Sequence, residues 1–363
     1  MITLREICTA FAPEYLERYP TLPTAHRQGI SAIQQCQSGA YGHSLYQCPA
    51  CGGPHRVNHS CGNRHCPQCQ QHKTQQWLQH HLDKQLPGPH FLLTFTVPEA
   101  LRPFIRSYQR PAYQALFQAS SMALKQLAKD QRFIGTDLLG FTGVLHTWGR
   151  QLQYHPHIHD IVPGGGLSPD RTAWRSARAN FLVPVKALSP IYRALVKEEM
   201  HRAGLLERID PQVWTIPWNV HSQAKHHGHS AVTYLAPYVF KVAISNHRLV
   251  RLTDRTVTFT YRQVGSARLR TAHLDVMEFL RRFLQHVLPH GFMKVRHFGF
   301  LHASCAVPLA TVRLLMGQGP PSEGRPPQRP PPPPRAARCP TCGASMRVVM
   351  RLWTSPRAFI DTG

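Results

Sequence analysis

Acidic residues are scarce in this chain. Its 363 residues include 18 Asp and Glu against 42 Lys and Arg, which gives a formal net charge of +24, and no carboxylate side chain occurs between residues 18 and 82. A charge of this sign favours polyanionic partners, nucleic acid first and an anionic membrane second. It also argues against a nuclease or transposase with a carboxylate triad and two metal ions, because few carboxylates are available to build such a site.

Long hydrophobic runs and two common motifs are also missing. The run FLLTFTV reaches about a third of the ~20 residues that a membrane-spanning helix needs. Glu6, Glu14 and Glu17 stand where a signal peptide would be basic and then apolar. We therefore expect a cytoplasmic protein without a membrane partner, whose ten cysteines bind metal rather than form disulfides. The chain has no GxxxxGK[ST] and no HExxH, which excludes a P-loop ATPase and a zinc protease of that type.

The length predicts two or three domains, and 42 % hydrophobic with 17 % charged residues is typical of globular protein. Helix-like and strand-like patterns both occur along the chain, and we expect an α+β fold. Changes of pattern divide the chain into an N-terminal helical segment, a zinc-binding domain, a catalytic domain, a Pro-rich linker and a basic tail, at residues 1–40, 41–85, 90–305, 306–338 and 339–363.

Two cysteine pairs define the predicted zinc site. Cys48 and Cys51 form one CxxC, Cys66 and Cys69 form another, and 14 residues separate the pairs. This spacing is typical of a tetrahedral Zn²⁺ site with two thiolates from each pair. The segment has too few apolar residues for an ordinary core, so the metal would supply much of its folding free energy. Its lack of carboxylates favours nucleic acid as the partner of this module.

Other potential ligands leave alternatives open. His59, Cys61 and His65 lie between the pairs, so a second metal or a histidine in place of a cysteine is equally compatible with the sequence. Cys339 and Cys342 form half a site, which could pair with a distant histidine, with another chain or with nothing. We assign this half-site no function.

Three histidines alternate in the strand-like run YHPHIHDIV. His157 and His159 would lie on one face about 6.6 Å apart, close enough to converge on a cation, while Ile158 would face a core. A hairpin with the preceding run FTGVLHTWGR would place His146 opposite His159, so we predict His146 as the third ligand, with His155 as the substitute. The alternative is a set of stacked surface histidines.

Tyr234 and Tyr238 are spaced to share one helical face, which Lys241 and Ser245 continue. Two phenols on a basic face could each attack a phosphodiester that a divalent metal polarises. The alternative is a pair of core aromatics, and Pro237 would kink such a helix.

Five motifs occur in an order that resembles one known family. The chain reads SCGNRHCPQC, LLTFTVPEALRP, HPHIHDIVPGGGLS, YLAPYVFKVAISNHRL and GFMKVRHFGFL. In this order they resemble the rolling-circle transposases of the insertion-sequence-91 family, which are two-tyrosine members of the HUH endonuclease superfamily. The resemblance covers most of residues 20–305.

The resemblance implies a ferredoxin-like antiparallel sheet that carries His157 and His159 and binds Mg²⁺ or Mn²⁺. It implies that Tyr234 or Tyr238 attacks single-stranded DNA and keeps a covalent 5′-phosphate, that the other tyrosine handles the second strand transfer, and that the zinc module recognises element ends. It also implies a bacterial, nucleoid-associated protein. Transesterification conserves the phosphodiester energy, so the reaction would need no ATP. Because the chain has no P-loop motif of a helicase, strand separation would come from a host helicase or from supercoiling. The competing interpretation is a non-catalytic, zinc-dependent DNA-binding regulator, in which both tyrosines would be dispensable.

Overall fold

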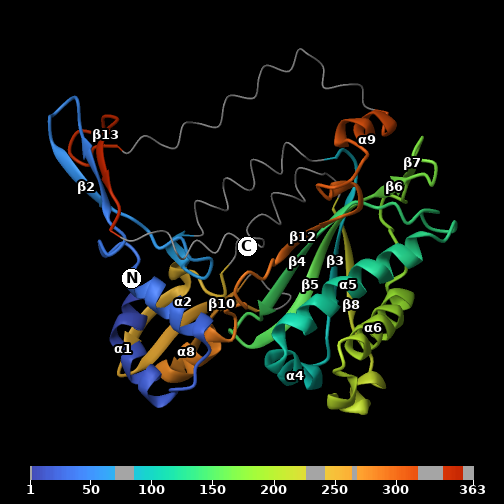
Figure 1. Cartoon of the computed structure of the whole chain (residues 1–363), viewed down its shortest axis with the longest axis horizontal. Coiled ribbons are helices and arrows are strands. Elements are labelled where there is room, and N and C mark those ends of the chain that lie inside the picture. The colour runs from blue at the N-terminus through green and yellow to red at the C-terminus, as the bar shows by residue number, and fades with distance from the viewer. Residues whose placement is uncertain (1, 70–85, 226–241, 264–267, 318–337, 355–363) are drawn as a thin grey trace.

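The computed structural model describes five stretches of the chain, residues 2–69, 86–225, 242–263, 268–317 and 338–354 (Figure 1). Helices and antiparallel sheets are mixed along these stretches, and cysteines cluster in the N-terminal part, so the predicted α+β class is confirmed. Across the described residues, no helix combines the length and the apolar character that crossing a membrane requires.

The largest sheet has five strands in the order β12–β4–β5–β3–β8, and each neighbouring pair is antiparallel. In that order the strands are Val295–Phe298, Phe141–Trp148, Tyr154–Pro163, His90–Thr96 and Val220–Lys225. Leu93, Phe95 and Ile158 on one face are fully buried in a core with helices α5 (Gln109–Ala128) and α6 (Val185–Arg202) (Figure 1). Because successive strand residues point to opposite faces, the residues next to them in sequence point away from these helices.

The elements of this sheet and of its helices follow one another along the chain in a short series. Strand β3 is followed by α4 (Arg102–Ser107) and α5, then by the β4–β5 hairpin, then by α6 and β8. The short strands β6 (Gly165–Leu167) and β7 (Trp174–Ser176) pair after β5, and α9 (Leu309–Leu315) follows β12. The hairpin places β5 between β4 and β3, so a residue of β5 has a backbone neighbour on both sides.

A second core joins the N-terminal helices to elements from residues 242–287. Helices α1 (Leu4–Arg18) and α2 (Thr24–Gln35) pack with α8 (Val276–Leu284) and a three-stranded sheet in the order β11–β10–β9. These strands are Leu269–Asp275, Thr256–Arg262 and Leu249–Thr253. The helices of the predicted N-terminal segment therefore share their apolar core with elements that lie more than two hundred residues later in the sequence.

Local interactions fix the position of α1 in this core. Its first turn is a capping box, in which the Thr3 hydroxyl accepts from the Glu6 N–H and the Glu6 carboxylate accepts from the Thr3 N–H. Farther along, the Glu14 carboxylate pairs with the Arg255 guanidinium at 2.7 and 2.9 Å. This pair ties α1 to the turn between β9 and β10.

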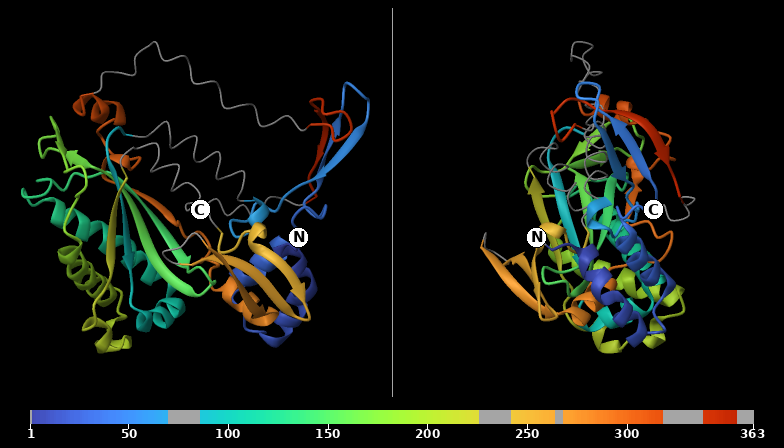
Figure 2. Two further views of the ribbon diagram at one scale, coloured as in Figure 1. Left: turned by 180° about the vertical axis from the view of Figure 1, so that it is seen from behind. Right: turned by 90° about the vertical axis from the view of Figure 1, so that its left-hand side faces the viewer.

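A separate three-stranded ribbon projects from the rest of the molecule (Figure 2). Strands β1 (His43–Gln47) and β2 (Pro54–Asn58) form a hairpin, and β13 (Arg347–Leu352) adds to its open edge, antiparallel to β1. The C-terminal tail thus returns to the N-terminal part of the chain.

Candidate functional site

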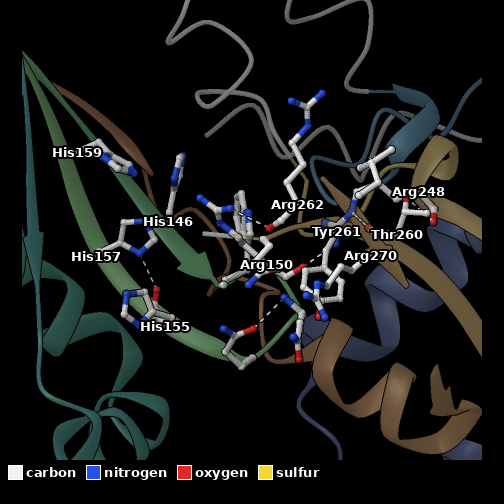
Figure 3. A pocket seen from close by; sticks show the side chains of 16 residues that line it. His146, Arg150, His155, His157, His159, Arg248, Thr260, Tyr261, Arg262 and Arg270 are labelled. Atoms are coloured by element: carbon white, nitrogen blue, oxygen red, sulfur yellow. Dashed lines mark hydrogen bonds between the residues drawn. The ribbon is translucent and has the colours of Figure 1, made fainter. Parts of the chain in front are cut away.

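Three histidines meet on the face of the main sheet that points away from α5 and α6 (Figure 3). His146 comes from β4, and His157 and His159 come from β5. Their ligand nitrogens all lie within 4.8 Å of one another, and the ring centroids are 4.7 to 5.4 Å apart. Imidazoles at such distances can hold one metal ion.

The register of the β4–β5 hairpin differs from the sequence prediction. His146 lies opposite His157, and Val144, not His146, lies opposite His159. The hairpin is centred about one residue earlier than expected: the Gly149 N–H donates to the Gln153 carbonyl at 2.8 Å, and the ladder is irregular just after His146. His146 stays in the cluster because all three rings still share one face.

Neighbouring groups orient the rings. The Nδ1–H of His157 donates to the His155 carbonyl at 2.7 Å, so a neutral His157 presents Nε2 as its basic nitrogen. Nδ1 of His159 is hydrogen-bonded to the Thr94 hydroxyl at 3.0 Å. Burial and the nearby His159 hold the pKa of His157 well below its usual range, which keeps this ring neutral and suited to metal ligation. Among the described residues, the predicted substitute His155 is outside the group of converging ligand atoms.

The carboxyl next to this cluster belongs to the other face of the sheet. Asp160 follows His159 but is fully buried, and burial raises its pKa to about 8. It is therefore neutral near pH 7 and is not part of the converging ligand group.

A basic cavity of about 1020 Å³ opens beside the histidines (Figure 3). One wall carries the three histidines, and the opposite wall is the β10–β11 hairpin with Tyr261, Arg262 and Arg270. Arg150 and Arg248 also line it, and their side chains are fixed by backbone carbonyls: Arg150 donates to the Arg262 carbonyl at 2.8 Å. No carboxylate is among the described residues that line the cavity, so it can bind a phosphate chain without acidic competition.

Tyr234 and Tyr238, the predicted nucleophiles, lie outside the described residues. The basic hairpin that faces the histidines was not singled out from the sequence. Its residues are more than a hundred positions away from the histidines, so only the fold brings the two together.

The predicted zinc ligands Cys48, Cys51, Cys66 and Cys69 do not come together. Among the described residues, the cysteines instead form two groups of four. The first, here called the core cluster, consists of Cys36, Cys61, Cys66 and Cys69, and the second, here called the ribbon cluster, consists of Cys48, Cys51, Cys339 and Cys342.

The physical reason is the β1–β2 hairpin, which carries the first CxxC pair out into the ribbon. The second pair instead stays in the core of α1 and α2, where Cys36 and Cys61 reach it; Cys69 Sγ lies 3.7 Å from Cys36 Sγ and 3.4 Å from Cys61 Sγ. Each group has four thiols with ligand atoms within 4.8 Å of one another, so each has the donor set of a tetrahedral Zn²⁺ site.

Two family models match this chain. Residues 7–97 match one described as "Transposase zinc-binding domain", and residues 140–308 match one described as "Putative transposase". The second match covers β4 and β5 with all three clustered histidines. These matches define the class of protein, which is a transposase with an N-terminal zinc-binding domain.

Two curated relatives give the family. The chain is 34 % identical to "Putative transposase y4qJ" of Sinorhizobium fredii over 98 % of both chains. It is 28 % identical to "Transposase for insertion sequence element IS801" of Pseudomonas savastanoi pv. phaseolicola, over 75 % of this chain and 69 % of that one. No solved structure matches. The chain belongs to the insertion-sequence-91 type of transposases, as the sequence motifs predicted.

Proposed function

We propose that this transposase nicks and rejoins single-stranded DNA by a rolling-circle mechanism with a covalent 5′-phosphotyrosine intermediate. The observation that supports it most is the meeting of His146, His157 and His159 at the wall of a basic cavity free of carboxylates among its described lining residues. Such a site can hold a metal ion and a phosphodiester together.

The topology of the main sheet agrees with this proposal. The order β3–helix–β4–β5–α6–β8 is a β-α-β-β-α-β arrangement, and its four strands lie in the order β4–β5–β3–β8. This order supports the proposed ferredoxin-like sheet, with β12 added at the β4 edge. In it the two central strands, β5 and β3, lie side by side, and β5 carries two of the three histidines.

We propose that His146, His157 and His159 hold Mg²⁺ or Mn²⁺. The neutral state and fixed orientation of His157 fit this role, and water and phosphate oxygens would complete the shell with the ligands that these ions prefer. When bound, the ion would supply polarisation of the scissile phosphate.

The remaining chemistry is assigned to the chain's own residues. We assign the attack to the phenolic oxygen of Tyr234 or Tyr238: a bond from this oxygen to phosphorus forms as the P–O3′ bond breaks, the phenolic proton passes to solvent, and the departing 3′ oxygen takes up a proton from solvent and leaves as a hydroxyl. The second tyrosine would carry out the second strand transfer. No ATP is needed, and strand separation falls to a host helicase or to supercoiling of the bacterial chromosome.

We further propose that the core cluster holds the zinc of the zinc-binding domain and that this domain contacts DNA at the element ends. All four of its cysteines fall inside the matched residues 7–97. Arg64, next to these cysteines in sequence, is buried and donates to the Pro289 and Phe292 carbonyls, which connects the cluster to the chain that follows α8.

The test of this function is covalent capture. The full-length protein is incubated with labelled single strands from candidate element ends and Mn²⁺, then separated on a denaturing gel. We expect a slow-migrating protein–DNA species that disappears when Tyr234→Phe and Tyr238→Phe are combined, while DNA binding persists, because only the nucleophilic oxygens are lost.

Tyr108→Phe is the matched control, because this tyrosine lies by α4, outside the cavity. An adduct that survives in the double variant but is lost with Tyr261→Phe would move the nucleophile to the tyrosine that lines the cavity. DNA binding with no adduct from the unaltered protein would favour the non-catalytic regulator.

DNA binding in the cavity gives a separate prediction. Combining Arg262→Gln with Arg270→Gln should weaken binding of a single-stranded oligonucleotide roughly tenfold, about 1.4 kcal/mol. The slope of log affinity against log salt should fall by about 0.7 for each phosphate that the protein no longer neutralises. Fluorescence anisotropy between 50 and 200 mM salt measures both values. Arg132→Gln removes a charge outside the cavity lining and should leave the slope unchanged.

A further inference from the structure

The ribbon cluster draws its four cysteines from opposite ends of the chain. Cys48 Sγ lies 3.5 Å from Cys342 Sγ, and Cys51 Sγ lies 3.6 Å from Cys339 Sγ. A tetrahedron of thiolates with Zn–S bonds of about 2.3 Å has sulfur–sulfur edges of about 3.8 Å. The four sulfurs are thus spaced as ligands of one ion. Cys48 and Cys51 lie inside the zinc-binding match, but Cys339 and Cys342 lie outside both matches, so neither match covers the whole site.

The two halves of the cluster are built alike. The sequence CPACG at residues 48–52 is repeated as CPTCG at residues 339–343. In both, the N–H of the first cysteine donates to the carbonyl five residues on, at 3.0 and 2.8 Å, and the glycine N–H donates back to the first cysteine's carbonyl, at 2.9 and 2.8 Å. Gly52 and Gly343 adopt left-handed backbone angles, with φ of 69° and 73°. Each turn therefore has the form of a metal-binding knuckle, one from each end of the chain. The two thiols of each knuckle face the two thiols of the other.

The strands next to the knuckles hold the same two ends together. Strand β13 pairs with β1 from His43–Leu352 to Gln47–Arg347. The two backbones approach so closely at Gly42 that a Cβ there would collide with the Leu352 carbonyl. Trp353 packs on the His59 ring at a centroid distance of 3.9 Å. The two knuckles are therefore held together by one continuous small sheet.

Little else in the ribbon could stabilise it. Its small core consists of Cys48, Cys339 and Met346, and all six β13 residues are exposed. Next to the sulfurs, His55 Nε2 lies 3.4 Å from Cys339 Sγ, where an imidazole N–H can stabilise a thiolate.

We propose that Cys48, Cys51, Cys339 and Cys342 bind a second structural Zn²⁺, which fastens the C-terminal tail to the N-terminal hairpin of the same chain. The predicted half-site at Cys339 and Cys342 is completed by a pair almost three hundred residues earlier. The ribbon is then one folding unit formed from both ends, and loss of the tail leaves the hairpin with two of four ligands. This inference does not depend on the nicking mechanism.

The test is zinc counting by native mass spectrometry and elemental analysis on the purified full chain. Combining Cys339→Ser with Cys342→Ser should remove one zinc per chain relative to the unaltered protein. Cys305→Ser is the matched control, because this half-buried cysteine belongs to neither cluster, and it should leave the count unchanged. An equal zinc content in the double variant and the control would overturn the proposal.

Alkylation mapping tests the same site without a variant that could misfold. Cys51 and Cys342 are exposed, so without a ligand they should react at once. We expect all four thiols of the ribbon cluster to be protected in the native protein and to become reactive together when a chelator removes zinc. Immediate reaction without chelator, or release only by a reductant as for disulfides, would overturn the proposal.

Discussion

Replacing His157 or His159 with alanine is expected to lower metal-dependent cleavage of single-stranded DNA about a thousandfold or more. Each ring supplies one of the three nitrogens that converge within 4.8 Å. Polarisation of the phosphate by the bound ion is worth several kcal/mol, and each 1.36 kcal/mol is a factor of ten in rate. Single-turnover cleavage of a labelled oligonucleotide, titrated with Mn²⁺, measures the loss. Partial recovery at high Mn²⁺ is expected, because two ligands remain.

Three further variants identify the third ligand and provide a negative control. His146→Ala should match the two β5 variants, whereas His201→Ala on α6, far from the cluster in sequence and on a helix, should have no effect. If His155→Ala abolishes cleavage and His146→Ala does not, the third ligand is His155, the substitute predicted from the sequence. Cleavage that survives excess chelator in the unaltered protein would contradict a metal-dependent site altogether.

The histidine cluster could be predicted from local pattern because the period of a strand is two. His157 and His159 had to share a face and Ile158 had to take the other, and Ile158 is indeed fully buried against the helices. The register could not be predicted, because it depends on a tight turn and an irregular ladder that the sequence does not mark. His146 still shares the face of His157 and His159 despite the wrong register, because a shift of two residues keeps a side chain on the same face.

The cysteines show the opposite case. The CxxC pairs are local and could be recognised, but a pair says nothing about which other pair completes its shell. Cys36 lies thirty residues before Cys66 and has no CxxC partner of its own, so its place in the core cluster follows only from the packing of α2. The repeat of CPxCG at residues 48–52 and 339–343 was a signal that could have joined the two ends.

The charge of the chain predicted nucleic acid as a partner but not where it binds. Arg262 and Arg270 face the histidines only because β10 and β11 belong to the core that α1, α2 and α8 share. Such a cavity between two cores depends on long-range packing, which composition does not report. Because of this packing, helices α1 and α2 and the core cluster support the wall of the cavity that β10 and β11 form.

Replacing Cys61 with serine is therefore expected to unfold this second core, with large losses of helical signal and of thermal stability. Structural zinc contributes apparent binding free energies of about 10–16 kcal/mol in small domains, comparable to the 5–15 kcal/mol that stabilise a whole domain. Cys61 Sγ lies 3.4 Å from Cys69 Sγ in the buried core cluster, where a serine hydroxyl is a poor zinc ligand. Circular dichroism melting together with zinc content measures the outcome.

Cys8→Ser is the control that separates loss of a ligand from loss of a buried thiol. Cys8 is fully buried in the same core but belongs to neither cluster, and burial raises its pKa to about 12, so it is an inert thiol. Burying a hydroxyl there should cost about 1–3 kcal/mol and leave the zinc content unchanged. If Cys61→Ser is no more damaging than Cys8→Ser and retains its zinc, the core cluster is not a metal site, and α1 and α2 are held by apolar packing alone.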